Sequence, residues 1–356
     1  MKKVLFIILG LDFSGAENVL LQYLHNNNEI DPCFVFVFEG NASREFSHSF
    51  EEGKIYELKI PYKKNELRFF PRATQYRFKK AVLPVIKQIK PDVLYFNNTH
   101  EVILSRSVIK ALRITSVGHV HDMKDSIGTY PKRHEAKQAF YEMTEVLTVS
   151  EACKKSWDTD KMKVVYNGVA DEFFRKTKPI ELKKPLTIGY VGMISKRKGF
   201  DLLAHAIDAL GDFVCWKIAY NLIEGEYQEV LNNVRNKNNV CMFYRIPRSQ
   251  MKEFYDTIDI LVIPSRQDPL PTVAIEAMAR KTLVLGADTG GIPELVGSGK
   301  YLFQREDSYA FEKKIIEYCS IDETELKNCI DEQYEYAFKL FRDINKKQII
   351  NSMITK

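Results

Sequence analysis

The sequence predicts an α/β protein built from two doubly wound domains, each a parallel sheet with helices on both faces. Three observations support this fold class. The chain has 356 residues, more than one hydrophobic core usually organises, so we expect two domains. Short apolar runs alternate with stretches of helical periodicity, which favours strand–helix–strand units. Polar residues and glycines follow several of these runs, and such proteins bind ligands at the carboxyl edge of the sheet.

The first domain is expected to span residues 1–168 and to begin with the strand Val4–Leu9. The charged start and apolar run also resemble a signal peptide, but no small-residue cleavage site follows, so we interpret them as a strand. Gly10 and Gly15 separate this strand from a helical pattern. A glycine there lets the backbone approach a phosphate or sugar, although two glycines also fit an ordinary turn. Further strands are expected at residues 33–38, 55–58, 93–96, 115–120 and 146–149.

Polar side chains gather at the ends of two of these strands. Asn97 and Asn98 follow the fourth strand, and His119, His121 and Asp122 lie at the end of the fifth. The two histidines are two residues apart, so both project to the same face of the strand. A lone histidine at a strand end is more often structural, whereas a pair beside an aspartate favours a ligand site. No cysteine or third histidine lies nearby in the sequence, so we do not expect zinc.

The second domain is expected to span residues 169–335, after a linker that the Asn-Gly turn at 167–168 and the charged stretch 175–184 indicate. Its strands are expected at residues 186–192, 216–219, 240–243, 260–263 and 282–285. The first of these strands ends in glycine and precedes Arg197 and Lys198. Glycine followed by a cation at the mouth of a strand suits a pyrophosphate, for which lysine acts as a point charge.

The stretch 258–296 carries the most informative pattern, with a strand, a proline-containing loop, a helix and a second strand. The loop holds Asp268, and the helix holds Glu276 among apolar neighbours, where a charge is costly without a partner. Two interpretations stay open here: the Glu276 carboxylate accepts two hydroxyls of a nucleotide ribose, or it pairs with a core Lys or Arg. We expect Thr272 to cap the helix, and free amides near residues 273–274 would suit a diphosphate.

The segment DPLPTVAIEAMA at residues 268–279, followed by GGIPE, closely resembles the signature of the retaining GT-B glycosyltransferases of family four, also called glycosyl transferases group 1. The resemblance is strong at 258–296, fair at 164–199 and loose in the first 160 residues. It implies two Rossmann-like domains facing a central cleft, with residues 336–356 as a helix that packs back on the N-terminal domain. The N-terminal domain would bind the acceptor, and the C-terminal domain would bind the nucleotide-sugar.

The resemblance also implies roles for single residues. Asp268 and the adjacent loop amides would contact the donor sugar, Glu276 the ribose, Lys198 the diphosphate, and His121 the sugar or acceptor side. The residues implied as catalytic are His121, Lys198 and Asp268. Those implied in donor binding are Gly15, Arg197, Lys198, Leu270, Pro271, Thr272, Val273 and Glu276. Those implied on the acceptor side are Asn98, His119 and Asp122.

Several positions depart from the family pattern. Asp268 is one methylene shorter than the glutamate that the family carries there, a change that bears on sugar choice. Met193 stands where the family has an arginine, and we expect Arg197 to take its place. Ser14 replaces a glycine, and the pair at 244–245, Tyr and Arg, stands where the family usually has a glycine beside the nucleotide base.

The expected function is that of a retaining, metal-independent hexosyltransferase. It would move a sugar from a nucleotide-diphosphate sugar to a saccharide or lipid-linked acceptor in cell-envelope polysaccharide or glycan synthesis. A UDP-sugar is favoured over a GDP-sugar as the donor. No cofactor is expected beside the donor. Two alternatives stay open: a non-catalytic glycosyltransferase-like partner subunit, which Met193 favours, and a nucleotide-sugar epimerase on the same fold.

The composition is that of a globular protein, with 45% hydrophobic and 28% charged residues. No apolar run reaches the ~18 residues that a spanning helix needs. The six cysteines include no C-x-x-C pair, which is typical of free, buried thiols in a reducing compartment. We therefore expect a cytoplasmic protein.

The net positive charge lies in the first half of the chain, where residues 1–168 contain 25 Lys and Arg against 20 Asp and Glu. Residues 63–90 contain nine basic residues, one acidic residue and four aromatic residues. This segment fits an anionic membrane surface at the inner face, and it equally fits a solvated helix face with its aromatics in the core. No nucleic-acid motif accompanies it, so we do not expect nucleic-acid binding.

Overall fold

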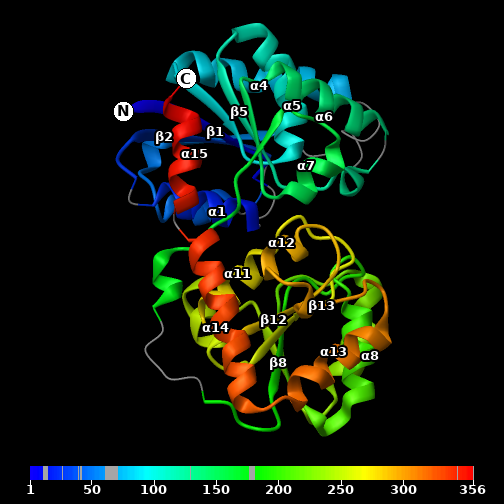
Figure 1. Ribbon diagram of the computed structural model, residues 1–356. Helices are drawn as coiled ribbons and strands as arrows, with labels where there is room; N and C mark the ends of the chain where they lie inside the picture. Colours follow the sequence, from blue (N-terminus) through cyan, green and yellow to red (C-terminus); the bar gives the residue numbers. More distant parts are fainter. Residues whose placement is uncertain are drawn as a thin grey trace. The chain divides into compact units, whose positions relative to one another are not determined.

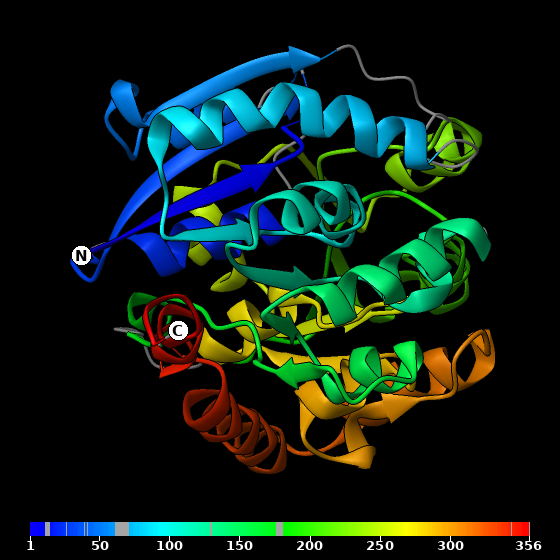
Figure 2. The same ribbon diagram turned by 90° about the horizontal axis from the view of Figure 1, so that it is seen from above.

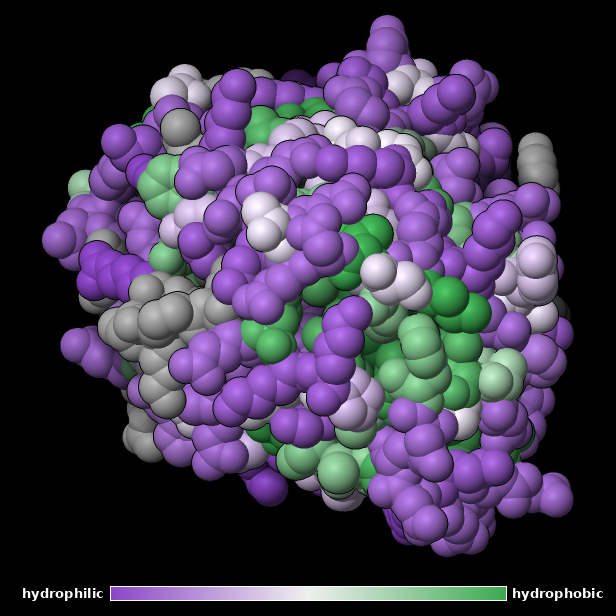
Figure 3. All heavy atoms as spheres, turned by 60° about the horizontal axis from the view of Figure 1, so that its bottom comes forward, coloured by the Kyte–Doolittle hydropathy of each residue, from purple (hydrophilic) through white to green (hydrophobic). Residues whose placement is uncertain are grey.

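The chain forms two compact units, each an α/β unit with a parallel sheet, and this confirms the predicted fold class (Figure 1). The computed structural model describes residues 1–10, 15–25, 27–38, 40, 42–60, 71–128, 130–175, 181–342 and 344–355. The first unit comprises Met1–Asn167 and Asp343–Lys356, and the second comprises Gly168–Arg342. Figure 3 shows a face on which hydrophilic residues predominate. Within the described ranges, no helix is long and apolar enough to cross a membrane.

The sheet of the first unit has seven strands, all paired in parallel, in the order β3-β2-β1-β4-β5-β6-β7. The strands are β1 (Lys2–Ile8), β2 (Ile30–Phe38), β3 (Ile55–Ile60), β4 (Val93–Phe96), β5 (Thr115–Val120), β6 (Glu145–Thr148) and β7 (Met162–Val164). The six expected strands are present, and β7 is an addition. The strand order reverses between β1 and β4, and crevices for ligands form beyond the carboxyl ends of strands at such a point.

Helices cover both faces of this sheet. They are α1 (Gly15–Leu24), α2 (Ala42–Ser47), η1 (Glu52–Lys54), α4 (Pro71–Ile89), α5 (Thr99–Leu112), η2 (Lys124–Ile127), α6 (Tyr130–Glu142), α7 (Glu151–Trp157) and α15 (Ile344–Ile354). Because successive strand residues face opposite ways, Val4 and Phe6 enter one hydrophobic core and Leu5 and Ile7 the other. The core with Val4 also contains residues of α1 and α15. The core with Leu5 includes residues of α4, which lies against β2 and β3 (Figure 2).

The sheet of the second unit has six parallel strands in the order β10-β9-β8-β11-β12-β13. The strands are β8 (Thr187–Val191), β9 (Cys215–Tyr220), β10 (Val240–Tyr244), β11 (Ile260–Ile263), β12 (Leu283–Ala287) and β13 (Leu302–Phe303). The five expected strands are present, and the two-residue β13 is an addition. Here the order reverses between β8 and β11, which places a second ligand edge at the ends of these two strands.

Helices again cover the sheet of the second unit. They are η3 (Asp171–Phe174), α8 (Phe200–Leu210), η4 (Gly211–Phe213), η5 (Gly225–Tyr227), α9 (Gln228–Arg235), η6 (Arg248–Gln250), α10 (Met251–Tyr255), α11 (Thr272–Ala279), α12 (Ile292–Val296), η7 (Gly299–Tyr301), α13 (Ser308–Ser320) and α14 (Glu323–Leu340). Helix α11 is buried from Ala274 to Ala279, with Glu276 in the middle of this stretch.

Two expected features fall partly outside the described residues, namely residues 176–180 of the linker and residues 63–70 of the basic segment. The six cysteines are free thiols. The expectation that they are all buried is wrong for Cys241, which is exposed at the β10 edge of the second sheet, and for the partly exposed Cys215.

Candidate functional site

The loop between β11 and α11 is held in place by the glycine pair that follows β12. The Gly291 amide donates to the Asp268 carbonyl oxygen at 2.9 Å. Gly290 has a φ of +56°, and a Cβ at this position would overlap the same carbonyl oxygen. Only glycine fits here, because the residue needs both a left-handed backbone and no side chain. The GGIPE segment therefore positions the loop that carries Asp268.

Lys198 contacts Asp268 directly. The Lys198 Nζ donates to Asp268 Oδ2 at 2.5 Å, and the Asp268 side chain is only 5% exposed. The neighbouring Gly199 has a φ of +72°, and a Cβ there would overlap the Pro264 carbonyl. This close approach brings the turn between β8 and α8 against the loop after β11, so the predicted cation and carboxylate meet at the edge where the strand order reverses.

Arg266 is a cation at this edge that sequence analysis missed. Its guanidinium binds both Asp201 carboxylate oxygens, at 2.7 and 2.8 Å, and also donates to the Lys196 carbonyl. The Arg266 amide donates to the Arg197 carbonyl. Arg266 therefore fastens the turn that carries Lys198. The signal that could have identified it was its place in the loop, two residues before Asp268.

Arg197 and Met193 lie on the same turn and differ in their contacts. The Arg197 side chain is exposed and donates to the Gln267 carbonyl at 3.3 Å, so it reaches the Asp268 loop. Met193 is held through its backbone, because its carbonyl accepts the Tyr190 hydroxyl at 2.7 Å. Burial raises the pKa of this hydroxyl, which keeps it a donor. The structure thus places a cation beside the loop despite methionine at position 193.

Glu276 is 1% exposed and has two side-chain partners. Arg248 Nη1 donates to Oε1 at 2.5 Å, and the Tyr255 hydroxyl donates to Oε2 at 2.8 Å. Burial, and then the charge of Glu276, raise the pKa of the Tyr255 hydroxyl. Of the two interpretations that the sequence left open, the structure shows the carboxylate paired with an arginine. Arg248 itself was not predicted.

The start of α11 differs from the expectation in two ways. Thr272 is the first residue of the helix and not its cap, and Pro271 stands at the capping position without a side-chain hydrogen bond. The Ala274 amide is not free, because it donates to the Pro271 carbonyl at 3.1 Å. Proline can precede a helix because its fixed φ suits the first turn. Leu270, Pro271, Thr272 and Val273 lie together at this helix start, and the first amides of a helix have no partner within it.

The end of β10 was expected to lie beside the nucleotide base. Arg245 has a φ of +54°, the left-handed conformation that glycine adopts most easily. Its amide donates to the Tyr220 carbonyl, and its guanidinium lies 5.1 Å from the centre of the Tyr244 ring. The departure from the family pattern therefore keeps the backbone conformation of a glycine while adding an exposed cation.

The first unit collects polar side chains at the carboxyl ends of β1, β4 and β5. His119 Nδ1 lies 2.8 Å from the Tyr95 hydroxyl, and the ring centres of His119 and His121 are 4.1 Å apart. Burial lowers the pKa of His119 well below its ordinary value and lowers that of His121 to about 3. Both imidazoles are therefore neutral at neutral pH. Asn98 caps α5, because its side chain accepts the Thr99 amide at 2.7 Å.

Glu101 is a second residue that sequence analysis missed. It lies in the first turn of α5, is 1% exposed, and accepts the Leu9 amide on Oε1 at 2.9 Å. Burial, and then the charge of Glu17, raise its pKa to about 8, so it holds a proton at neutral pH. Glu101 could have been identified from the sequence, because it is an acidic residue inside the apolar pattern of a helix, as Glu276 is.

Several buried polar atoms in this cluster have no partner among the described residues. They are Asn97 Nδ2, Thr99 Oγ1, Glu101 Oε2, His119 Nε2, His121 Nε2 and Asp122 Oδ2. Buried polar atoms are normally hydrogen-bonded, so such a concentration suits the hydroxyls of a bound molecule. Gly15 begins α1, and a Cβ there would meet no atom within 4 Å. The stretch 11–14 before Gly15 lies outside the described residues.

In the part of the chain that is described, no group of three or more His, Cys, Asp or Glu side chains is arranged to hold a metal ion. The described part of the basic segment is α4. It buries Phe78 in the core and leaves Tyr76 67% exposed, so the segment combines a core face with a polar outer face.

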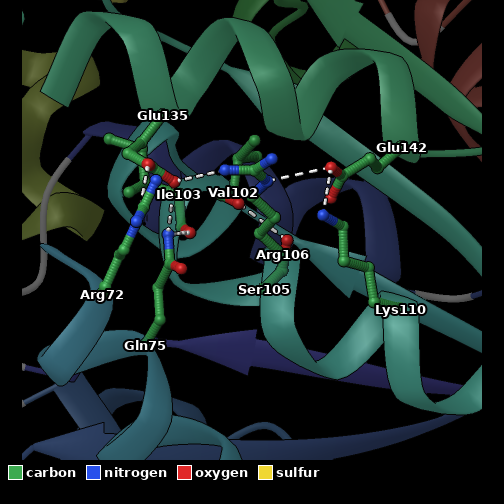
Figure 4. Close-up of polar contacts among 9 residues, drawn as sticks. All are labelled: Arg72, Gln75, Val102, Ile103, Ser105, Arg106, Lys110, Glu135 and Glu142. Atoms are coloured by element: carbon green, nitrogen blue, oxygen red, sulfur yellow. Dashed lines mark hydrogen bonds and ion pairs between the residues drawn. The ribbon is translucent and has the colours of Figure 1, made fainter. Parts of the chain in front are cut away.

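A polar network fastens α4 to α5 and α6 (Figure 4). The Gln75 side-chain amide donates to the Ile103 carbonyl at 2.9 Å and to Glu135 Oε2 at 3.1 Å. Arg106 binds Glu135 at 2.8 Å and Glu142 at 2.9 Å. Despite burial, the hydrogen bond and charge of Arg106 lower the pKa of Glu135. The network fixes the inner side of α4 and leaves its outer side to solvent.

Residues 171–336 match the model of the family described as Glycosyl transferases group 1. The second unit belongs to that family. Within this group 1 unit lie Lys198, Asp268 and Glu276, in the positions described above. The first unit lies outside the matched residues, so its polar cluster is described from the structure alone.

Two relatives of known name match part of the chain. Alpha-maltose-1-phosphate synthase of Mycolicibacterium smegmatis is 26% identical over 186 residues, which cover 45% of this chain and 47% of that protein. The putative teichuronic acid biosynthesis glycosyltransferase TuaC of Bacillus subtilis is 29% identical over 142 residues, covering 40% of this chain and 34% of that protein. The chain therefore spans about half, or less, of the relatives that it matches.

A solved structure resembles the whole chain. The crystal structure of Anabaena Alr3699/HepE in complex with UDP and glucose gives a TM-score of 0.82 at 18% identity, over 100% of both chains. At this identity the likeness establishes the fold, which is GT-B with two Rossmann-like units. This likeness in fold covers both units.

Proposed function

We propose that this protein is a retaining glycosyltransferase that moves a sugar from a nucleotide-diphosphate sugar to a saccharide or lipid-linked acceptor. One observation carries the proposal: the group 1 unit places Lys198 against Asp268 beside the start of α11, and Glu276 lies in that same helix. Neighbouring elements thus carry a cation for the diphosphate, a carboxylate for the sugar and a carboxylate for the ribose.

The proposed chemistry assigns a task to each group. The bond between the anomeric carbon and the diphosphate oxygen breaks, and the diphosphate keeps the electron pair. The acceptor oxygen bonds to the same face of the anomeric carbon, and its proton passes to the departing diphosphate. Preorganised cations and amides accelerate such a step by stabilising the developing negative charge. Lys198, Arg197 and the amides of Thr272 and Val273 take this role, and Asp268 orients the sugar hydroxyls.

We propose that the donor is a UDP-sugar in preference to a GDP-sugar. The support is that Alr3699/HepE, which shares the fold, forms a complex with UDP and glucose. Further support comes from Arg245 at the end of β10, which has the left-handed backbone that glycine adopts most easily, at the position where the resemblance implies a glycine beside the nucleotide base. The proposal includes no metal and no cofactor beside the donor.

We propose that the polar cluster of the first unit binds sugar hydroxyls on the acceptor side, with His121 nearest the reacting sugar. Neutral imidazoles and a protonated carboxyl can each donate or accept a hydrogen bond, which suits hydroxyl groups. Asn98, His119 and Asp122 belong to the same edge. The name of TuaC, a teichuronic acid biosynthesis glycosyltransferase, supports cell-envelope polysaccharide as the setting.

We also propose that the protein works as a peripheral protein at the cytoplasmic face of a membrane, through α4. Residues 71–90 contain six Lys and Arg and no acidic residue. Lys80 and Lys87 are exposed on the outer side of the helix with Tyr76. Anionic lipid attracts such a helix face, and each basic residue near the surface contributes about 1 kcal/mol.

Binding and product analysis together test the proposed activity. We expect one of UDP, GDP and ADP to raise the melting temperature of the wild type, because a ligand that binds the native state stabilises it by mass action. The shift should shrink in Lys198→Ala and survive in Lys196→Ala, a change to an exposed lysine on the same turn. Nuclear magnetic resonance of the product should show the anomeric configuration of the donor.

Two results would count against this function. An inverted product would exclude retention. A wild type that responds to none of the three nucleotides or their sugars would favour the partner-subunit alternative, which the methionine at position 193 supports.

A further inference from the structure

Arg248 joins three elements of the second unit around the Glu276 carboxylate. It begins η6, and its guanidinium donates to Glu276 in α11. The centre of the same guanidinium lies 5.1 Å from the centre of the Phe173 ring in η3. The Arg248 side chain is 38% exposed, whereas that of Glu276 is 2% exposed. A partly exposed cation thus reaches inward to a buried carboxylate.

The hydrogen bonds at Glu276 do not use all of its acceptor positions. Among the described residues, Oε1 accepts one side-chain hydrogen bond, from Arg248, and Oε2 accepts one, from Tyr255. An ionised carboxylate has about four acceptor positions, two on each oxygen. Each oxygen therefore keeps acceptor capacity, and two acceptors on one rigid carboxylate match two hydroxyls on adjacent carbon atoms.

The Arg248 charge offsets the cost of burying Glu276. A buried carboxylate loses its water and is stable only with a cation or several hydrogen-bond donors. The hydrogen bonds of Arg248 and Tyr255 reach different oxygens, so together they also set the rotation of the carboxylate plane. Removing Arg248 would leave a single neutral donor to do both tasks.

Phe173 is itself fixed to the helix that carries Glu276. Arg280, at the C-terminal end of α11, donates to the Phe173 carbonyl at 3.3 Å and to the Arg175 carbonyl at 2.9 Å. It also binds both carboxylate oxygens of Asp256, at 2.9 and 2.6 Å. Arg248 therefore lies between a ring and a carboxylate that belong to one rigid assembly, which limits the positions that its guanidinium can take.

We propose that Arg248, supported by Phe173, is a positioning residue for ribose recognition: it holds the Glu276 carboxylate with one acceptor position on each oxygen presented to the adjacent hydroxyls of a donor ribose. The proposal rests on the proposed function for the ribose role of Glu276. It adds Arg248 to the residues of the donor site. It also explains how the buried Glu276 carboxylate can be paired with an arginine and still bind the ribose.

The test compares a ribonucleotide with its deoxy form. Calorimetric titration measures UDP and 2′-deoxy-UDP binding to the wild type, Arg248→Met, Arg248→Lys and Lys252→Met. Lys252 is the matched control, because it also lies over the Phe173 ring, at 5.9 Å, but pairs with Glu172. If the wild type binds GDP or ADP instead, the same pair of that nucleotide is used.

A ribose-specific loss is the expected result. Arg248→Met should weaken UDP binding about tenfold, the usual scale for a hydrogen bond to a charged group, and should change 2′-deoxy-UDP binding much less. Arg248→Lys should recover part of the loss, and Lys252→Met should match the wild type. Equal losses for the two nucleotides would assign Arg248 a merely structural role and overturn the proposal, as would no loss at all.

The remaining outcomes are also decisive. If Arg248→Met does not fold, the comparison is made with Arg248→Lys. This variant should still weaken the binding of UDP more than the binding of 2′-deoxy-UDP. If nucleotides bind with the expected pattern but no sugar is transferred, the proposed function fails and the positioning role stands. If neither the wild type nor any variant binds a nucleotide, the positioning role is overturned together with the donor site.

Discussion

Three buried side chains at the carboxyl edge of the first sheet, His119, His121 and Glu101, share a shifted pKa that leaves them uncharged at neutral pH. Burial lowers the pKa of His119 and His121, and burial raises the pKa of Glu101 to about 8. All three are therefore uncharged at neutral pH. Uncharged polar groups avoid the desolvation and repulsion that buried ions would suffer, so they can lie together without counter-ions.

The raised pKa of Glu101 makes the stability of the first unit depend on pH. Glu101 keeps its proton in the folded state up to about pH 8, whereas the unfolded chain releases it near the ordinary value of a glutamate. The contribution is fully present below that ordinary value and is lost as pH rises through about 8. Melting curves between pH 5 and 8 should therefore show a fall in stability in the wild type that Glu101→Gln reduces.

Glutamine is the suitable replacement because its side-chain carbonyl still accepts the Leu9 amide. The matched control is Glu57→Gln in β3, since Glu57 is exposed. A wild-type curve with the same pH slope as Glu101→Gln would contradict the raised pKa.

At this scale, sequence analysis was most successful where one short segment contains the chemistry. Asp268 and Glu276 could be singled out because the strand, loop and helix around them are contiguous. The pairing of each carboxylate with its cation could not be predicted, because Lys198 is 70 residues from Asp268 and Arg248 is 28 residues from Glu276. Such pairs depend on how two turns meet at a sheet edge, and local periodicity does not encode that meeting.

Among the elements, β12 shows how a side chain completes a sheet. The two-residue β13 pairs with β12 only at Gly286 and Ala287. Further back along β12, the Gln333 side chain of α14 accepts the Val284 amide at 2.7 Å and donates to the Val284 carbonyl at 2.9 Å. Gln333 is 1% exposed, so water cannot substitute for it. The Gln333 side chain therefore makes the two backbone hydrogen bonds that a residue of a neighbouring strand would make.

We predict that Gln333→Leu destabilises the second unit by about 2 kcal/mol or more, because it leaves a buried N–H and a buried C=O without partners. Urea unfolding measures the loss of stability, and hydrogen exchange of the Val284 amide reports it locally. Glu335→Leu serves as the control, since Glu335 lies on the exposed side of α14. Equal stability of the two variants would show that the Gln333 hydrogen bonds contribute little.

The elements that sequence analysis missed are the shortest ones. β7 has three residues and β13 has two, so neither offers enough apolar residues for a pattern. They exist because neighbouring strands supply hydrogen-bond partners, which is a tertiary effect. The longer buried strands were predictable because strands covered by helices on both faces are continuously apolar.

For the whole molecule, the membrane proposal gives a direct prediction. Wild-type protein should sediment with vesicles that contain phosphatidylglycerol in low salt, and Lys80→Glu with Lys87→Glu should reduce the bound fraction at least tenfold. The control reverses two exposed lysines of the second unit, Lys313→Glu with Lys339→Glu, for the same change in net charge. If wild-type protein stays in the supernatant, or both double variants behave alike, α4 is not the binding surface.

The C-terminal helix gives the order in which the chain can be completed during synthesis. Ile349, Ile350 and Met353 of α15 are fully or almost fully buried in a core shared with β1, the strand made first. Every residue of the second unit leaves the ribosome before these three do, so that unit can fold as an uninterrupted chain. The unit that is translated first is thus the unit that is finished last. Until then, one face of its sheet lacks part of its cover and offers apolar surface to chaperones.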